Sequence, residues 1–230
     1  MLQHIRLLIL DLDYVVFDCT LLKVQALRQS LIALADIIPQ SVRLPDGTDA
    51  EEGFREHGFR WLRHLEIGLD EERLKPLEQA YGIHESRLIE SGIGRIHRGI
   101  EAFLMHCRQL NAAVALGADA SRDYLIRVTE RHQLDNLFQI ALCTEEFGVG
   151  STGEMLDEIM RQAEVNPSET LVLGTRPHCF QAAHGLDVLT IGCGWGIRQP
   201  QALAEADLQS LTLAQLYPAL QKADSLASQG

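Results

Sequence analysis

The alternation of short apolar runs with helix-length amphipathic segments constrains the fold of this chain more than any other feature. Residues 5–10 form one such run, which is short enough to be a strand buried on both faces, as strands of parallel sheets are. After Gly99 the same alternation continues towards the C-terminus. Strands that alternate with helices are joined by crossovers, so the sequence predicts an α/β fold with a doubly wound parallel sheet. The further predicted strands are residues 112–116, 138–142, 171–173 and 188–191, and the predicted helices are residues 100–110, 121–132, 154–164, a short one from about 178, and 213–220.

The segment between the first strand and Gly99 has a different pattern. Apolar residues recur at helical spacing from Leu21 to Ile38, and after a turn around Pro45 the charged helical pattern continues, without strand-like alternation. We therefore expect a core domain formed by residues 1–18 and 96–230, with a small helical domain of residues 19–95 inserted after the first strand. The polar tail after Lys222 is expected to fray.

Charge and composition exclude several classes of partner. The formal net charge of -12 repels nucleic-acid phosphates, so we expect no nucleic-acid binding. No apolar run approaches the length of a membrane helix, and acids stand where a signal peptide would be cleaved, which predicts a cytoplasmic protein with no membrane partner. The five cysteines include no CxxC pair and are expected to be reduced thiols.

Two aspartates, Asp11 and Asp13, close the first predicted strand. Ligands of open parallel sheets bind at the carboxyl ends of strands, and residues two apart on an extended segment point to the same side. A carboxylate pair at that place has two uses. One carboxylate can attack a phosphoryl group while the other protonates the leaving oxygen, or the pair can hold Mg²⁺.

Around these aspartates the sequence resembles a known family. The string LLILDLDYVVFD is similar to the first motif, DxDx(T/V), of the haloacid dehalogenase-like (HAD) hydrolases. Two more stretches, HRGIEAFLMHCRQLN and LVLGTRPHCFQAAHGLDVLTIG, are similar to the helix that re-enters the core and to the fourth motif of this family. The resemblance, which is to phosphoglycolate-phosphatase-like members, implies that residues 19–95 are a helical cap. It also implies that Asp11 is the nucleophile, that Asp13 is the acid/base, and that the ligand is a small phosphorylated metabolite.

The second and third motifs of the family are altered in this chain. Where the family has a Ser or Thr that contacts the phosphoryl group, the sequence offers Gly117 or Ala118. Gly150 stands at the position of the family's lysine, and no other lysine is near enough in sequence to replace it. The chain has lysine only at positions 23, 75 and 222.

The fourth motif is altered as well. Thr175 and Cys179 stand at the positions of the family's acids, which leaves Asp11 and the backbone carbonyl of Asp13 as metal ligands. Mg²⁺ binding is therefore expected to be weakened, and no other cofactor is expected. Arg176 either forms an anion-binding corner with Thr175 or pairs with an acid, which can be Asp11.

Cys143, Cys179 and Cys193 all fall near predicted carboxyl ends of strands, with His178 beside them. A thiol or soft-metal site is one reading of this placement. Packing in the core is the other, and it is favoured because the spacing matches no ligand pattern.

These departures predict a phosphatase-derived protein that is weak or inactive in phosphoryl transfer, in effect a pseudoenzyme that acts by binding or regulation. Its partner would be a small phosphorylated metabolite or a protein, including a second copy of the chain. The alternative is an active, divergent phosphatase of small phosphate esters, with Asp11 as nucleophile, Asp13 as acid/base and Arg176 in the role of the lysine.

Overall fold

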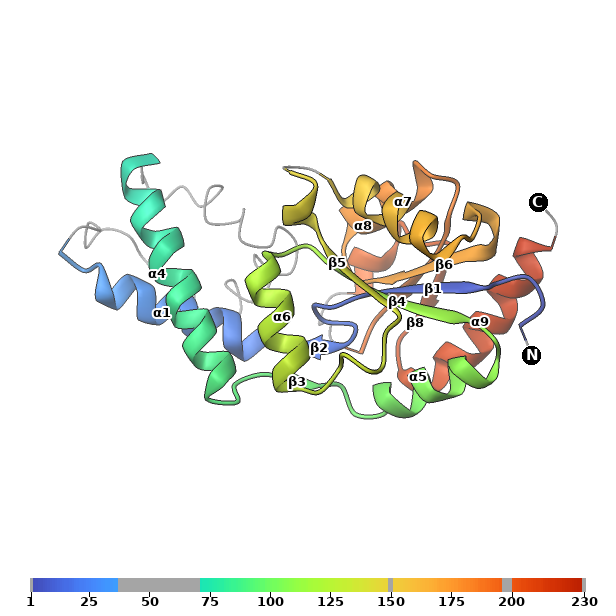
Figure 1. Ribbon diagram of the computed structural model, residues 1–230, viewed down its shortest axis with the longest axis horizontal. Helices are drawn as coiled ribbons and strands as arrows, with labels where there is room; N and C mark the ends of the chain where they lie inside the picture. The colour runs from blue at the N-terminus through green and yellow to red at the C-terminus, as the bar shows by residue number, and fades with distance from the viewer. Residues whose placement is uncertain (1, 37–70, 149–150, 196–199, 229–230) are drawn as a thin grey trace. The chain divides into compact units, whose positions relative to one another are not determined.

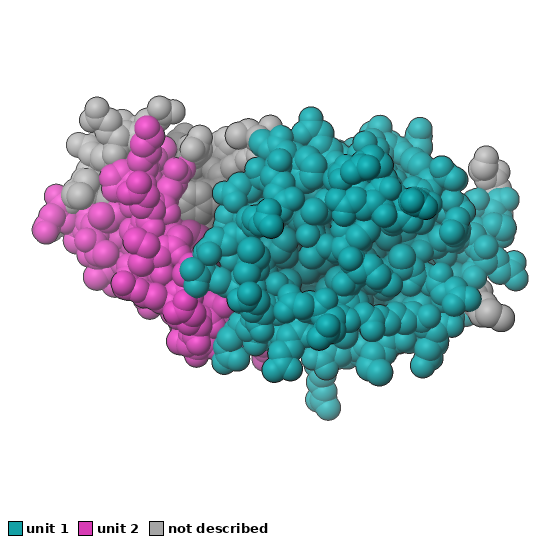
Figure 2. Space-filling view, in the orientation of Figure 1, with its two compact units in different colours: residues 1–18, 96–230 teal, residues 19–95 magenta. Residues whose placement is uncertain are grey.

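The computed structural model describes residues 2–36, 71–148, 151–195 and 200–228. The predicted turn at Pro45 and the position of Gly150 lie outside these residues. The chain divides into two compact units, of which unit 1 comprises Met1–Asp18 and Ile96–Gly230, and unit 2 comprises Cys19–Arg95 (Figure 2).

Unit 1 contains a six-stranded sheet in which all neighbouring strands are parallel. The strand order is β5-β4-β1-β6-β7-β8, so the first strand of the chain lies inside the sheet between β4 and β6. The predicted doubly wound parallel sheet is thereby confirmed. The strands are β1 (Leu7–Asp11), β4 (Ala113–Ala118), β5 (Ile140–Cys143), β6 (Thr170–Gly174), β7 (Leu189–Cys193) and β8 (Leu208–Ser210).

Helices cover both faces of this sheet (Figure 1). On one face, α7 contacts β1, β4 and β5, and α8 contacts β6 and β7. On the other face, α5 contacts β4, and α9 contacts β7 and β8. The helices are α5 (Ile100–Gln109), α6 (Arg122–Arg131), α7 (Thr152–Ala163), α8 (Pro177–His184) and α9 (Leu213–Ala227).

The side chains of β1 alternate between these two faces and set the position of the aspartates. Leu7 and Ile9 pack into the apolar cluster that holds Met155 and Ile159 of α7. Every residue of the strand is buried. Asp11 continues the alternation of Leu7 and Ile9, so its carboxylate emerges on the face covered by α7 and α8.

The described residues of unit 2 are mostly helical, as predicted. Its helices are α1 (Thr20–Ala33) and α4 (Glu71–Glu90), which pack against each other. Two short strands that were not predicted, β2 (Phe17–Asp18) and β3 (Arg95–Ile96), pair where the chain passes between the units. No helix in the described part of the chain combines the length and the hydrophobicity needed to span a membrane.

The C-terminal segment differs from the prediction. Instead of ending near Leu220 and fraying, α9 continues to Ala227 and includes Pro218 within it. The reason is a contact with the other end of the chain. The Asp224 carboxylate accepts hydrogen bonds of 2.8 to 3.0 Å from the backbone N–H groups of Gln3, His4 and Ile5. The last turns of α9 therefore fix the entry into β1.

We predict that Asp224→Asn lowers the free energy of unfolding by about 1–2 kcal/mol at pH 7, because hydrogen bonds to a charged acceptor are replaced by weaker ones. Burial alone would raise the pKa of Asp224, but the N–H donors hold it below its usual value. The stabilisation is thus complete above a pH of about 4, where the unfolded side chain is ionised, and is lost as the pH falls through the folded-state pKa.

Urea denaturation at pH 7 and at a series of more acidic values measures this contribution. The exposed Asp157→Asn is the control and should leave stability unchanged within about 0.5 kcal/mol. A loss for Asp224→Asn that persists undiminished at acidic pH contradicts the assignment.

Candidate functional site

The candidate site lies at the carboxyl end of β1. The chain moves from β1 outwards to β4 and β5 and then returns to β6 on the other side of β1. The strand order therefore reverses between β1 and β6, and this is where open α/β sheets bind their ligands. Asp11 ends β1, and Thr175 and Arg176 directly follow β6. The structure thus brings these three predicted site residues to the same edge of the sheet.

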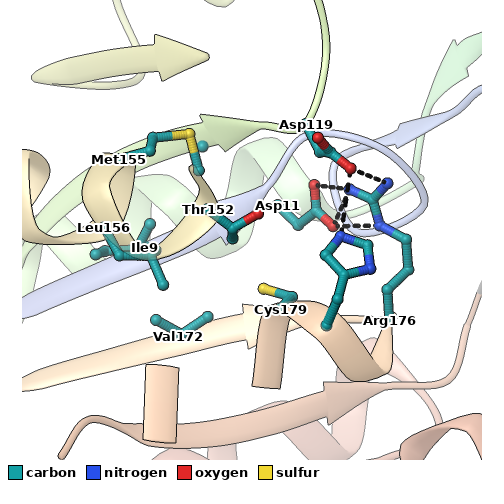
Figure 3. Close-up of a pocket in the computed structure, with 11 residues that line it drawn as sticks. Ile9, Asp11, Asp119, Thr152, Met155, Leu156, Val172, Arg176 and Cys179 are labelled. Atoms are coloured by element: carbon teal, nitrogen blue, oxygen red, sulfur yellow. Dashed lines mark hydrogen bonds and ion pairs between the residues drawn. The ribbon is translucent and has the colours of Figure 1, made fainter. Parts of the chain in front are cut away.

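Arg176 forms a buried, bidentate ion pair with Asp11 (Figure 3). Its Nη2 donates to Oδ1 and Oδ2 of Asp11 at 3.1 and 2.9 Å, and its Nε donates to Oδ2 at 3.3 Å. The side chains of Arg176 and Asp11 are only 2% and 5% exposed. Both carboxylate oxygens of the candidate nucleophile are therefore engaged by the guanidinium. Of the two interpretations of Arg176 from the sequence, the structure shows pairing with Asp11.

Asp119 is a further member of the site that the sequence interpretation missed. Its Oδ2 lies 3.4 Å from Nη1 of Arg176 and 3.3 Å from Nε2 of His178, and its Oδ1 accepts from the hydroxyl of Thr144 at 3.0 Å. Asp119 follows β4 and is two residues beyond Gly117. That spacing was a signal for it, because alternate residues of an extended segment point to the same side.

The charges of these groups are strongly coupled. Burial alone would lower the pKa of Arg176, but the carboxylates of Asp11, Asp119 and Asp13 raise it above its usual value. Burial raises the pKa of Asp11, and Arg176 counteracts this effect. For Asp119, burial acts upwards, but His178 and Arg176 hold the pKa below its usual range. The guanidinium is thus the permanent positive charge of the cluster.

Asp13 has a different partner. The hydroxyl of Tyr124 donates to Oδ1 of Asp13 at 2.7 Å in a buried environment. Tyr124 lies in the first turn of α6, where the side chain of Ser121 accepts from its backbone N–H and caps the helix. This N-cap of α6 therefore fixes the position of Tyr124, which in turn orients Asp13, the candidate acid/base. Sequence patterns gave no signal for this contact, since it depends on the rotation of α6 about its axis.

The two residues at the second-motif position are placed differently from each other. Gly117 lines the pocket beside Asp11, and its carbonyl accepts the N–H of Leu12 at 2.8 Å. A Cβ there would lie 3.0 Å from the side-chain end of Met155. Ala118 is buried and is not among the residues that line this pocket. Neither residue supplies a hydroxyl, so a phosphate-binding role for them remains a prediction.

Thr175 is fully buried at the end of β6. Its hydroxyl has no hydrogen-bond partner among the described residues. A buried polar atom without a partner carries a free-energy cost, which a bound water molecule or ligand would relieve. Of the predicted phosphate-binding residues, Thr175 is therefore the one whose side chain has a polar atom without a hydrogen-bond partner in the described part of the chain.

The pocket next to the ion pair is narrow. Its polar side is formed by Asp11, Asp119, Arg176 and His178, and its cavity volume is about 10 Å³, which holds no more than about one water molecule. Figure 3 shows the labelled carboxylates and Arg176 pointing toward one another, with the apolar side chains gathered away from them. The apolar side is lined by Ile9, Met155, Leu156, Val172 and Cys179.

The donor set does not fit the Mg²⁺ site that the family resemblance implies. Mg²⁺ requires oxygen ligands at about 2.0–2.1 Å in octahedral geometry, but both oxygens of Asp11 already accept from Arg176. Thr175 and Cys179 provide no carboxylate. No group of three or more His, Cys, Asp or Glu side chains among the described residues could hold a metal ion.

The cysteines near the strand ends are buried, and none forms a disulfide. Burial raises the pKa of Cys143, and it raises that of Cys179 to about 12. Cys193 is shifted strongly in the same direction, also by burial. Thiols that stay protonated are poor nucleophiles and poor metal ligands, which favours the packing interpretation.

The fold and the aspartates together define a Rossmann-like α/β protein with a carboxylate site at the point where its strand order reverses. A family model described as haloacid dehalogenase-like hydrolase matches residues 8–193, and the chain belongs to this family. The resemblance found in the sequence is thereby confirmed. Among curated proteins, none matches this sequence significantly.

Several solved structures share the fold. A predicted phosphatase from Clostridium acetobutylicum has a TM-score of 0.81 at 15% identity, with 96% of this chain and all of that chain covered (100%). A predicted phosphoglycolate phosphatase from Haemophilus somnus has a TM-score of 0.74 at 15% identity, with coverage of 95% and 99%. CbbY from Rhodobacter sphaeroides, in complex with phosphate, has a TM-score of 0.73 at 15% identity, with coverage of 92% and 96%.

We predict that Arg176→Met lowers the free energy of unfolding by about 3–5 kcal/mol, because it leaves the buried Asp11 without a counter-charge. The matched control is Arg161→Met. Arg161 also pairs with a carboxylate, that of Glu158, but its side chain is 70% exposed, so its loss should leave the stability nearly unchanged. Urea denaturation at pH 7 measures both, and equal losses would show that the pair with Asp11 is not stabilising.

We also predict that none of the five cysteines reacts with a thiol reagent such as dithionitrobenzoate at pH 8 while the protein is folded. All are buried, and burial also raises the pKa of Cys107 to about 12. In urea all five should react. Fast modification of Cys179 in the folded protein, located by peptide mass spectrometry, would contradict the packing role.

Proposed function

We propose that this chain is a HAD phosphatase-fold protein that binds its ligand at the end of β1 and β6 and transfers phosphoryl groups weakly or not at all. The observation that carries the proposal is the engagement of both Asp11 oxygens by Arg176. A nucleophile must place a free oxygen about 3–3.5 Å from the phosphorus atom and in line with the leaving group. Asp11 has to leave a buried ion pair before it can do so.

The energetics of that departure support the proposal. Separating a buried ion pair leaves both charges uncompensated, which costs several kcal/mol. A cost of that size added to the barrier slows a reaction by two or more orders of magnitude. The cavity volume of about 10 Å³ beside Asp11 also leaves no room for a phosphoryl group unless the side chains move.

The balance of charge supports it as well. Phosphoryl transfer depends on cations that stabilise charge on the transferring group. Here the single guanidinium of Arg176 is shared between Asp11 and Asp119, with Asp13 close enough to raise its pKa further. Among these described groups there are three carboxylates and one guanidinium. This excess of negative charge disfavours the binding of a phosphoryl dianion.

The proposed ligand is a small phosphorylated metabolite that is bound at the carboxyl ends of β1 and β6. Two observations support this class. The hydroxyl of Thr175 has no partner among the described residues, and CbbY, which is similar in fold, is known in complex with phosphate. A protein partner or a second copy of the chain is the other class of ligand. The buried, protonated thiols also suit the cytoplasmic location that we propose.

A specific contact favours the second candidate, an active divergent phosphatase. Tyr124 holds Asp13 by a hydrogen bond of 2.7 Å, as a residue that orients an acid/base would. In this candidate Asp11 attacks the phosphorus atom, Asp13 protonates the leaving oxygen, and Arg176 turns from Asp11 to the phosphate in the role of the lysine.

One assay separates the two candidates. We expect purified protein to show no turnover of a generic aryl phosphate, or of a panel of phosphorylated metabolites, above the level of Asp11→Asn, with or without Mg²⁺. Turnover that Asp11→Asn abolishes would rule out the inactive protein and support the phosphatase. An active HAD phosphatase assayed in parallel verifies the conditions.

Binding is tested by thermal shift with the same metabolites, because a ligand of the folded state raises the melting temperature. We expect at least one metabolite to raise it in a saturable way, with a smaller shift in Thr175→Val. If no metabolite changes the melting temperature, a protein partner is favoured instead.

A further inference from the structure

We propose that Arg176 is the resident cation of this site: its guanidinium stands in for the divalent ion, and the site accepts Mg²⁺ only when Arg176 is removed. This role of Arg176 is independent of turnover, because the carboxylates need a neutralising cation in an inactive protein and an active one alike. The donor set of the described residues disagrees with the metal site that the family resemblance implies.

The geometry of Arg176 is that of a bridging cation. It reaches Asp11 at the end of β1 through Nη2 at 2.9 Å, and Asp119 after β4 through Nη1 at 3.4 Å. Arg176 itself enters from the end of β6. One positive group therefore ties together the ends of three adjacent strands, and a metal ion coordinated by Asp11 would have to compete with it for a carboxylate oxygen.

The burial of Arg176 shows how completely the site depends on this cation. A fully buried guanidinium is costly unless its charge is paired and its donors are satisfied, and Arg176 is among the largest fully buried side chains of the described chain. Its counter-charges are Asp11 and Asp119, which it pairs directly. Removing the cation would leave buried carboxylates that need another positive charge.

The groups that would then be exposed suit a hydrated divalent ion. Mg²⁺ commonly binds through one or two carboxylates and keeps several water molecules. Asp11 and Asp119 both line the pocket beside Arg176 and supply two carboxylates. The small volume left by the arginine side chain would admit water for the remaining ligands.

The experiment compares wild type, Arg176→Ala and the control Arg122→Ala by thermal shift and calorimetry, with millimolar MgCl₂ against NaCl of equal ionic strength. Arg122 is also an arginine near the carboxyl ends of the strands, but its side chain is 68% exposed in its ion pair with Glu146. Methylguanidinium at millimolar concentration serves as a mimic of the missing side chain.

We expect Mg²⁺ to leave wild type and Arg122→Ala unchanged. Arg176→Ala should melt at a lower temperature, and both Mg²⁺ and methylguanidinium should raise that temperature in a saturable way. In Asp11→Asn/Arg176→Ala the response to Mg²⁺ should be lost. If Arg176→Ala is unfolded alone, its folding on addition of Mg²⁺, followed by circular dichroism, is the readout.

Three outcomes would overturn the proposal. The first is Mg²⁺ binding to wild type that is lost in Asp11→Asn. The second is rescue of Arg176→Ala by methylguanidinium without any response to Mg²⁺, which would make the pair a structural ion pair alone. The third is an Arg176→Ala variant that responds to neither cation or stays unfolded with both. None of these outcomes depends on turnover, so they are distinct from the failure of the proposed function.

Discussion

The buried ion pair between Asp11 and Arg176 is the interaction on which the arrangement of the site depends. It joins side chains that are 165 residues apart in sequence, and it lies where β1 and β6 end side by side. Two charges can be buried there because each is satisfied: three N–H···O contacts reach Asp11, and Arg176 also reaches Asp119. The parallel register of the sheet makes this contact, since it brings both strand ends to one edge.

The sheet itself could be predicted from the sequence because its information is local. Apolar runs such as residues 5–10 indicate strands that are buried on both faces, and the helix-length segments between them indicate the crossover helices. Contacts between residues far apart in sequence produce no such local pattern. The end of α9 reads as a polar tail in the sequence, yet Asp224 accepts N–H groups some 220 residues away. β8, a strand of three residues, is too short to show any alternation.

The site could be predicted only where its residues fall on family motifs. Asp11 ends β1, Asp13 follows that strand, and Thr175 and Arg176 follow β6, so the parallel sheet places all four at one edge. Of these four, Asp11 and Arg176 line the pocket. The motif comparison pointed to Gly117 and Ala118, whereas the side chain that reaches Arg176 from β4 belongs to Asp119. Strand order and side-chain direction decide which acid pairs with Arg176, and a sequence motif specifies neither of them.

The altered motifs are physically connected to one another. With Thr175 and Cys179 in place of acids, the site loses ligands that would hold a divalent ion, and Asp11 would be left buried without a counter-charge. Burial alone already raises its pKa, which means that the ionised carboxylate is costly there. A guanidinium one residue beyond Thr175 removes that cost without any external ion. The loss of the acids removes the ligands of an external cation, and Arg176 supplies the positive charge in its place. The cation that neutralises Asp11 is thus part of the chain.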